Sequence, residues 1–304
     1  MFPSFLPTKV GQLTEAASIA IAQQIQLAEI STPLAEKTVT TAYAHQVPQG
    51  QGNGQTPLLL IHGFDSSLLE FRRLFPLLAT EKDTWAVDML GFGFTDRVAG
   101  IKYSPTAIKT HLYYFWKTLI NQPVILVGAS MGGAAAIDFT LTYPEIVEKL
   151  ILIDSAGLVG GSPLVKLMFS PLDTWLTNFL KSPKVRQNIS RAAYKNKELA
   201  SIDAQLCAAL HLELPNWNTA LITFTKSGGY SAFRFKELMK IQQETLILWG
   251  DSDKILGTKD AARFKRAIPN SKLIWIQDSG HVPHLEQPQI TAKHVLDFAK
   301  SKKS

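Results

Sequence analysis

Short apolar runs alternate with longer mixed segments along most of the chain, and this rhythm constrains the fold more than any other feature. The runs have the length of β-strands, and most of the segments between them have the length of helices. Continuous apolar runs are typical of strands covered on both faces, and strands that alternate with helices form parallel sheets. The runs are 58–61, 85–87, 124–127, 150–153, 246–249 and 273–276. The sequence therefore predicts an α/β fold with a mostly parallel central sheet and helices on both faces.

The rhythm is interrupted once, between 153 and 246, where no strand-like run occurs. We interpret 157–237 as a helical cap inserted into an α/β core that comprises 36–156 and 238–304. Residues 1–35 are predicted to form an N-terminal helical appendage, with an amphipathic helix over 14–30 and Thr14 as its N-cap. A strand is expected at 37–45. With 46% hydrophobic residues, the 304-residue chain can fill a core of this size.

Cysteine content and terminal composition indicate the compartment. Cys207 is the single cysteine and lies in an apolar run, so we expect a buried, unreactive thiol and no intramolecular disulfide. The N-terminus has no positively charged segment ahead of an apolar stretch, which does not fit a secretory signal. No apolar run is long enough to span a bilayer. These features predict a cytoplasmic protein, with peripheral membrane contact as the alternative.

A short glycine-rich motif lies between a predicted strand and a predicted helix. The run 124–127 continues into Gly128-Ala129-Ser130-Met131-Gly132-Gly133, and a helical pattern follows. This Gly-x-Ser-x-Gly spacing suits a serine on a sharp turn, because a Cβ at the neighbouring glycines would clash with backbone. The motif therefore predicts Ser130 as a nucleophile.

A serine hydroxyl is a weak nucleophile unless a base removes its proton, and the base needs a carboxylate to orient it. His281 follows the run 273–276, and Asp253 follows the run 246–249. The order Ser130, Asp253, His281 resembles the α/β-hydrolase superfamily over about 36–300. The resemblance identifies a serine-nucleophile member with a helical cap, similar to esterases, lipases and carbon–carbon bond hydrolases.

The resemblance also implies an oxyanion hole. Ile61-His62-Gly63-Phe64-Asp65 follows the first strong strand and is similar to the family's oxyanion loop. The backbone N–H groups of Phe64 and Met131 would then bind the negative charge of the transition state. The segment 88–97 resembles the next loop of the family, for which we expect a structural role.

The identity of the acid has two competitors to Asp253. Asp251 lies in the same loop, and Asp154 ends the strand before the cap, where some family members carry their acid. The position within Gly-Asp-x-Asp favours Asp253. His281, His284 and Glu286 also have spacing that a metal site could use, but the triad already accounts for His281. We therefore predict no metal and no cofactor.

A serine in the Gly-x-Ser-x-Gly turn, the nucleophile elbow, argues against two reactions of this superfamily, because its haloalkane dehalogenases and epoxide hydrolases place an aspartate there. Ester hydrolysis through an acyl-enzyme is the favoured activity. The alternatives are C–C bond hydrolysis of vinylogous diketones, which uses a similar Ser-Met-Gly-Gly elbow but usually has Asn where this chain has Ala129, thioester hydrolysis, and cofactor-free haloperoxidase chemistry. The complete triad argues against a non-catalytic membrane-surface binding protein.

The composition of the predicted cap bears on the substrate. Residues 157–237 contain ten basic and five acidic residues, so they carry +5 of the chain's net charge of +6. The apolar stretch 164–180 precedes a basic stretch, which is a composition typical of an interfacial element. The alternative is that the apolar residues pack on the core and the bases face water. We expect an apolar, long-chain or lipid-like ester and no nucleic-acid partner. Contact with an anionic membrane surface is predicted for Lys181, Lys184, Arg186, Arg191, Lys195 and Lys197.

Overall fold

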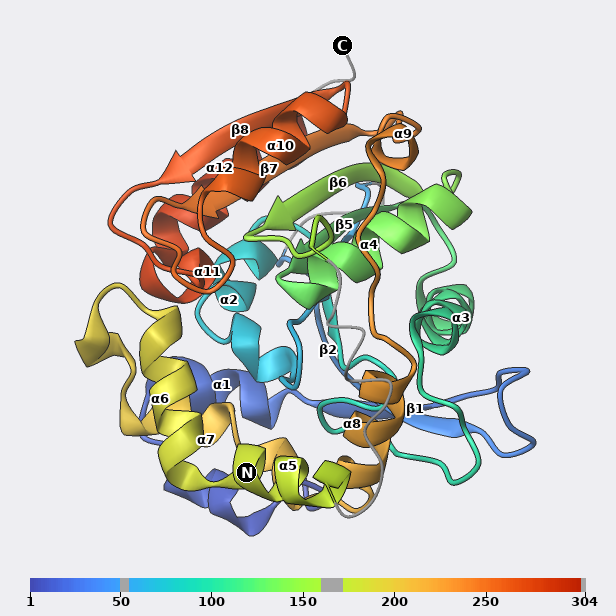
Figure 1. Ribbon diagram of the computed structural model, residues 1–304, viewed down its shortest axis with the longest axis vertical. Coiled ribbons are helices and arrows are strands. Elements are labelled where there is room, and N and C mark those ends of the chain that lie inside the picture. The colour runs from blue at the N-terminus through green and yellow to red at the C-terminus, as the bar shows by residue number, and fades with distance from the viewer. Residues whose placement is uncertain (50–54, 160–171, 302–304) are drawn as a thin grey trace.

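A single eight-stranded sheet organises the chain in the computed structural model, which describes residues 1–49, 55–159 and 172–301 (Figure 1). The strand order is β1-β2-β4-β3-β5-β6-β7-β8. The pairs β1–β2 and β2–β4 are antiparallel and all other pairs are parallel. The predicted α/β class is therefore confirmed. The strands are β1 (Gln26–Ile30), β2 (Val39–Gln46), β3 (Leu58–Ile61), β4 (Thr84–Val87), β5 (Val124–Ala129), β6 (Val147–Ile153), β7 (Glu244–Gly250) and β8 (Ser271–Ile276).

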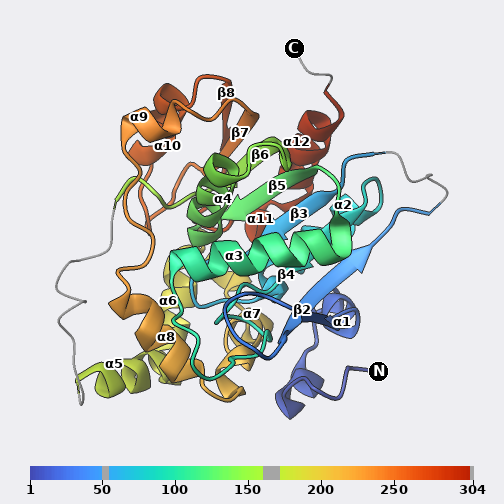
Figure 2. The same cartoon turned by 90° about the vertical axis from the view of Figure 1, so that its right-hand side faces the viewer.

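The apolar runs are continuous because both faces of the sheet are covered. In β3, Leu58 and Leu60 pack into one buried cluster, with residues of α1, α2 and α12. Leu59 and Ile61 pack into a second cluster on the opposite face, with residues of α3, α4 and α10. Figure 2 shows α3 crossing in front of the strands. The helices of the core are α1 (Ala16–Gln23), α2 (Phe75–Ala79), α3 (Pro105–Phe115), α4 (Met131–Thr142), α10 (Lys259–Ala267), α11 (Pro283–Glu286) and α12 (Pro288–Lys300).

The N-terminal segment differs from its prediction. Helix α1 ends at Gln23, and residues 26–30 form β1, which pairs with β2 in a register that places Ile30 opposite Val39. The prediction of a helix across 14–30, and hence of a wholly helical appendage over 1–35, is wrong for this strand. Ile30 is fully buried at the sheet edge, so pairing with β2 and burial of this β-branched side chain outweigh continuation of a short helix.

The described part of the segment between β6 and β7 consists of helices joined by loops and contains no strand. Helices α5–α8 lie together at one end of the molecule, whereas α9 contacts α10 (Figure 1). Their bounds are α5 (Leu172–Lys181), α6 (Pro183–Ala193), α7 (Ile202–Cys207), α8 (Trp217–Lys226) and α9 (Phe235–Leu238). We use "cap" below for 172–226. The apolar residues of 164–171 lie outside the described residues, as do the side chains of 172–176.

Candidate active site

Ser130 occupies a strained turn between β5 and α4. Its φ is 52° and its ψ is −119°, a backbone conformation that residues other than glycine rarely adopt. A Cβ on Gly128 would lie 2.3 Å from the carbonyl oxygen of Gly132, and a Cβ on Gly132 would lie 2.1 Å from the carbonyl oxygen of Ile61. The glycines of the motif therefore allow backbone to pack closely around the turn, which presents Ser130 at the carboxyl end of β5.

Three loops at the carboxyl ends of β5, β7 and β8 bring Ser130, Asp253 and His281 together. The Nε2 atom of His281 lies 3.0 Å from Ser130 Oγ, and its Nδ1 atom lies 2.9 Å from Asp253 Oδ2. The other carboxylate oxygen of Asp253 accepts hydrogen bonds from the N–H groups of Ile255 (2.7 Å) and Leu256 (3.1 Å). Each group thus has the neighbour that a base-activated serine requires.

The charge state of Asp253 follows from these partners. Burial alone would raise the pKa of this carboxyl, but its hydrogen bond to His281, the charge of a protonated His281 and the two backbone donors together lower the pKa below its ordinary value. An ionised Asp253 favours the His281 tautomer that carries its proton on Nδ1, which leaves Nε2 free to accept the proton of Ser130.

The two competing carboxylates have other partners. Asp251 accepts hydrogen bonds from the N–H groups of Asp278 (3.1 Å) and Ser279 (3.3 Å), so it holds the loop that leads to His281. Asp154 accepts a hydrogen bond from the N–H of Gly250 at 3.0 Å. Within the described ranges, the side chain that bonds Nδ1 of His281 is that of Asp253.

The loop predicted to supply an oxyanion donor is held by buried polar groups. His62 Nδ1 bonds the carbonyl of Gly63 at 2.8 Å, and His62 Nε2 accepts the N–H of Met89 at 3.1 Å. Burial lowers the pKa of His62 to about 4, so this imidazole stays neutral and keeps that tautomer. Glu70 accepts the N–H of Gly63 at 2.9 Å. A Cβ on Gly63 would lie 3.3 Å from the Cβ of Ser130, which places the loop directly beside the serine.

The predicted oxyanion donors are the N–H groups of Phe64 and Met131, and Met131 directly follows Ser130 in the chain. Phe64 follows Gly63, and its ring packs against Phe92. Met131 is the first residue of α4, so its N–H has no acceptor within the helix, and the helix N-terminus favours negative charge. The oxyanion role of both groups stays a prediction.

A cavity of about 280 Å³ opens beside Ser130 and His281. Asp65, Ser66, Glu70, Arg72, Arg186 and Ser190 contribute polar groups, but most of the exposed surface of its wall is apolar. Cys207 forms part of this wall. It is buried as predicted, and burial raises the pKa of its thiol. The apolar or weakly polar lining residues are Phe64, Ile189, Ala193, Tyr194, Ala204, Cys207, Ala208, Ile255, Val282 and Leu285. A larger groove, about 940 Å³, lies at the amino ends of β6–β8, away from Ser130.

Polar contacts attach the cap to the loops that carry Phe64 and His281. Asp65, which follows Phe64 and has a φ of 48°, accepts hydrogen bonds from Trp217 Nε1 (2.8 Å) and His211 Nε2 (3.2 Å) and forms an ion pair with Arg186. Because all three partners belong to the cap, Asp65 joins the predicted oxyanion loop to it. Sequence reasoning missed this function of Asp65, since no local spacing reveals contacts across more than a hundred residues.

A second attachment involves the His281 loop. Glu286 accepts the N–H of Gly280 (2.6 Å) and the N–H groups of Lys195 (3.0 Å) and Asn196 (2.8 Å) in the cap. The N–H of His281 itself donates to the carbonyl of Ala193 at 2.7 Å. The backbone of the histidine loop is therefore bonded directly to the cap.

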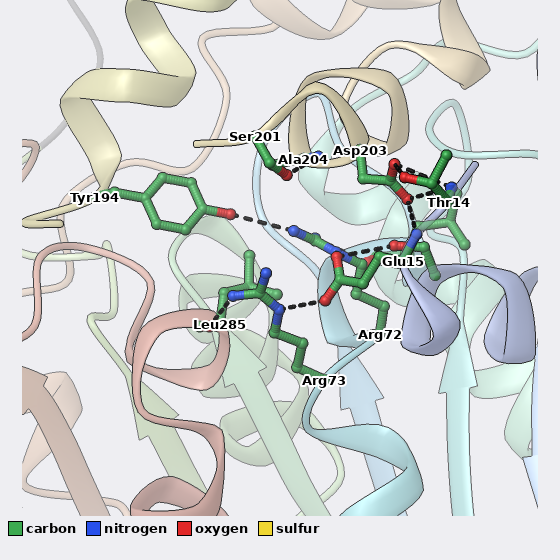
Figure 3. A network of polar contacts seen from close by, with 11 residues as sticks. Thr14, Glu15, Arg72, Arg73, Tyr194, Ser201, Asp203, Ala204 and Leu285 are labelled. Atoms are coloured by element: carbon green, nitrogen blue, oxygen red, sulfur yellow. Dashed lines mark hydrogen bonds and ion pairs between the residues drawn. The ribbon is translucent and has the colours of Figure 1, made fainter. Parts of the chain in front are cut away.

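The N-terminal segment forms a third attachment, shown in Figure 3. Asp203 of α7 accepts hydrogen bonds from the N–H and hydroxyl of Thr14 and from the N–H of Glu15. Glu15 in turn pairs with Arg72 and Arg73 of the core. The segment predicted to be an appendage thus bridges core and cap.

The structure changes the interpretation of the basic residues of the cap. Arg186 pairs with Asp65, Lys195 pairs with Asp278, and Lys197 donates to backbone carbonyls of the cap itself. Lys184 and Arg191 are exposed. Lys181 lies over the Trp217 ring, with Nζ 6.0 Å from the ring centre. None of the helices in the described ranges is both long and apolar enough to cross a membrane.

Comparison with known proteins identifies the family of the chain. The family model for the alpha/beta hydrolase fold matches residues 56–288. The alpha/beta hydrolase domain-containing protein VTE7 of Arabidopsis thaliana is 33% identical over 99% of this chain and 91% of its own length. Lipase 1 of Psychrobacter immobilis is 25% identical over 90% of this chain and 87% of its own. The structure of a meta-cleavage product hydrolase from Pseudomonas fluorescens superposes with a TM-score of 0.73 at 22% identity, covering 89% of this chain and 97% of the other. The chain belongs to the α/β-hydrolase family.

Proposed function

We propose that this protein is a serine hydrolase that cleaves carboxylic esters through an acyl-enzyme. The observation that carries the proposal is the continuous chain of hydrogen bonds from Ser130 through His281 to Asp253 at the edge of an apolar cavity. Ser130 Oγ attacks the ester carbonyl carbon while His281 Nε2 takes the hydroxyl proton. The tetrahedral intermediate collapses, the C–O bond to the alcohol breaks, and His281 gives its proton to the departing alkoxide.

The second half of the cycle reverses these roles. His281 removes a proton from water, the resulting hydroxide attacks the acyl carbon, and the released Ser130 oxygen regains the proton. In both halves the carbonyl oxygen becomes negatively charged, and the N–H groups of Phe64 and Met131 are the proposed donors to it. Asp253 stays ionised and orients His281 throughout.

The cavity supports an apolar acyl group or alcohol as the substrate. Its wall is mostly aliphatic or aromatic, and its volume of about 280 Å³ lies near the lower end of ordinary small-molecule sites. Ile189 and Ile255 line the cavity and also reach solvent, so a longer chain could continue along an apolar mouth. The similarity to a bacterial lipase agrees with such a substrate.

A series of p-nitrophenyl esters of increasing acyl length tests the proposal, with Ser130→Ala as the control. We expect hydrolysis by the wild type, a preference for longer acyl chains, and no enzyme-dependent hydrolysis by the variant. A vinylogous diketone and an acyl thioester are assayed in parallel. Turnover of the diketone without turnover of any ester would establish C–C bond hydrolysis, which the Ser130-Met131-Gly132-Gly133 elbow also suits. Preference for the thioester would replace ester cleavage with thioesterase activity.

We also propose contact between the cap and an anionic membrane surface, through fewer residues than the sequence indicates. Lys181, Lys184 and Arg191 are exposed, as is Lys195, which forms a surface ion pair with Asp278. The exposed side chains of Phe179 and Ile189 lie on the same two helices as the first three cations. Each such cation contributes about 1 kcal/mol near an anionic bilayer, and the attraction fades within about 8 Å at physiological salt.

Liposome co-sedimentation measures this contact. Binding to anionic vesicles should exceed binding to neutral ones and should weaken at high salt. Lys184→Glu should reduce it, whereas Lys272→Glu, an exposed lysine on β8, should not. If Lys184→Glu and Lys272→Glu bind anionic vesicles equally, the basic residues of the cap face water and do not contact a membrane. Cytoplasmic location and the lack of a nucleic-acid partner stay predictions.

A further inference from the structure

Asp154 is a buried acid beside the proposed triad to which the mechanism above gives no role. It follows β6, is fully buried and has a φ of 41°, in the left-handed region. Its Oδ1 atom accepts the N–H of Gly250 at 3.0 Å. Its Oδ2 atom is also buried and has no hydrogen-bond partner among the described residues. An orphaned carboxylate oxygen in such a place requires an explanation.

The nearest candidates for a partner belong to the triad. Asp154, Asp253 and His281 offer side-chain oxygen and nitrogen atoms that all lie within 4.8 Å of one another, and all three side chains are buried. Two buried carboxyl groups at this separation repel each other when both are ionised, which favours a state in which one of them retains a proton. The question is which one carries it.

The hydrogen bonds answer this question. Asp253 faces three donors, namely His281 Nδ1 and two backbone N–H groups, and so is stabilised as the carboxylate. Asp154 faces one backbone donor and the negative charge of Asp253. Burial, and next the charge of Asp253, raise the pKa of Asp154 well above its ordinary value. Glu286 contributes in the same direction. The proton therefore belongs on Asp154.

We propose that Asp154 is a positioning residue whose protonated carboxyl donates a hydrogen bond from Oδ2 to the carboxylate of Asp253. The bond restrains the Asp253 carboxylate in addition to its backbone donors and keeps it aligned with His281. This inference rests on the proposed serine-hydrolase function, but it concerns the resting protein and does not depend on the substrate. It also explains how two aspartates that follow neighbouring strands, Asp154 after β6 and Asp253 in the loop after β7, can coexist near the histidine.

A metal site made of the same three residues fits the geometry less well. Both ring nitrogens of His281 already have partners, Nδ1 with Asp253 and Nε2 with Ser130. A cation would have to displace one of them, and it would also need Asp154 to be ionised. The hydrogen bonds of His281 therefore leave neither of its ring nitrogens free for a cation.

Three variants test the proposal by ester turnover. In Asp154→Asn, the side-chain oxygen can still accept from Gly250 and the amide N–H can donate to Asp253, so kcat should stay within about tenfold of wild type, the factor that a single hydrogen bond represents. Asp154→Leu fills similar space without a donor, and kcat should fall by about 100-fold with little change in KM, because His281 loses its alignment. Asp253→Asn should reduce kcat by about 10⁴-fold.

Two outcomes would overturn the proposal. If Asp154→Asn is as inactive as Asp253→Asn, Asp154 acts as an ionised acid; if Asp154→Leu folds and keeps wild-type kcat, Asp154 has no positioning role. Thermal unfolding of each variant identifies a loss of fold. The infrared spectrum supplies a readout that needs no substrate and serves even if Asp154→Leu does not fold. At neutral pH, wild type and Ser130→Ala should show a protonated carboxyl band that Asp154→Asn lacks, and equal bands in all three would contradict the proposal.

If wild type turns over no ester while the band behaves as expected, the proposed function fails and the placement of the proton stands. If ester turnover is normal but Asp154→Asn keeps the same protonated carboxyl band as wild type, the placement of the proton fails and the proposed function stands. The two proposals can therefore be rejected separately.

Discussion

The core and the cap are held in different ways, and the catalytic loops lie where the two meet. In the core, buried strands such as β3 and β5 pack apolar side chains on both faces of the sheet. The cap also packs apolar side chains such as Trp217 and Phe224 into the core, but buried polar groups link it in addition, among them Asp65, Glu286 and Asp203. Asp65 lies in the predicted oxyanion loop and Glu286 holds the loop of His281. The core thus determines where the reacting groups are, and the cap contacts determine how their loops are held.

The difference has a physical basis. Apolar packing is non-directional, so it can fix the ends of strands without specifying the orientation of a loop side chain. A buried hydrogen bond fixes both distance and direction, and it leaves a costly unpaired group when it is broken. We therefore expect changes in the triad to affect chemistry alone, changes at Asp65 to affect chemistry and cap attachment together, and changes far from Ser130 to affect stability.

The largest effect is expected at the triad. Ser130→Ala and His281→Ala should each reduce kcat by about 10⁶-fold, and the double variant should be no worse than either, because the residues act as a unit. Thermal unfolding should change little, since the sheet does not depend on these side chains. Additive losses in the double variant, measured by kcat on a p-nitrophenyl ester, would show that they act independently.

Asp65→Ala should have the next largest effect. The change leaves Arg186 without its carboxylate and leaves buried groups of His211 and Trp217 unpaired, so the loop that carries Phe64 loses its alignment. We expect kcat to fall by about 100-fold and the protein to become less stable. Asp297→Ala removes an exposed helical ion pair with Lys293 and is the control. If the two variants have the same kcat, the cap does not hold the oxyanion loop.

Asp203 and Glu213 provide a matched comparison away from Ser130, because both link the N-terminal segment to the cap. Asp203 is buried and accepts two backbone N–H groups, whereas Glu213 forms an exposed ion pair with Lys9. Asp203→Ala should lower the free energy of unfolding by about 1–3 kcal/mol, and Glu213→Ala by less than about 1 kcal/mol. Chemical denaturation measures both. Equal losses would mean that burial of the link does not matter.

A smaller, pH-dependent effect should come from the core. Nε2 of His111 lies 2.7 Å from Thr41 Oγ1, and burial lowers the pKa of His111 to about 4. Between about pH 4 and 6.5 an unfolded histidine binds a proton that the folded one does not, so this residue makes the protein less stable as pH falls. His111→Gln should remove that contribution. It accounts for at most about 3 kcal/mol of the free energy of unfolding that the protein loses between pH 6.5 and 4. If wild type and His111→Gln show the same pH dependence of unfolding, folded His111 is not held neutral.

The same contrast separates what the sequence could predict from what it could not. The six apolar runs fall within strands because burial on both faces leaves a local signal, and Gly128 and Gly132 mark the serine turn because the backbone packs against them there. Asp253 was preferred to Asp154 from position alone, and their contact across two strands could not be read from either segment. Strand β1 was missed because it is stabilised by pairing with β2 and not by its own composition.

The most direct test of the account is covalent labelling of the serine. Incubation with a fluorophosphonate, followed by intact-mass and peptide mass spectrometry, should show one adduct on Ser130 in the wild type. Ser130→Ala should show none, and His281→Ala should react far more slowly because the hydroxyl proton has no acceptor. An unlabelled wild type, or an adduct on another residue that persists in Ser130→Ala, would contradict the proposal that Ser130 forms an acyl-enzyme.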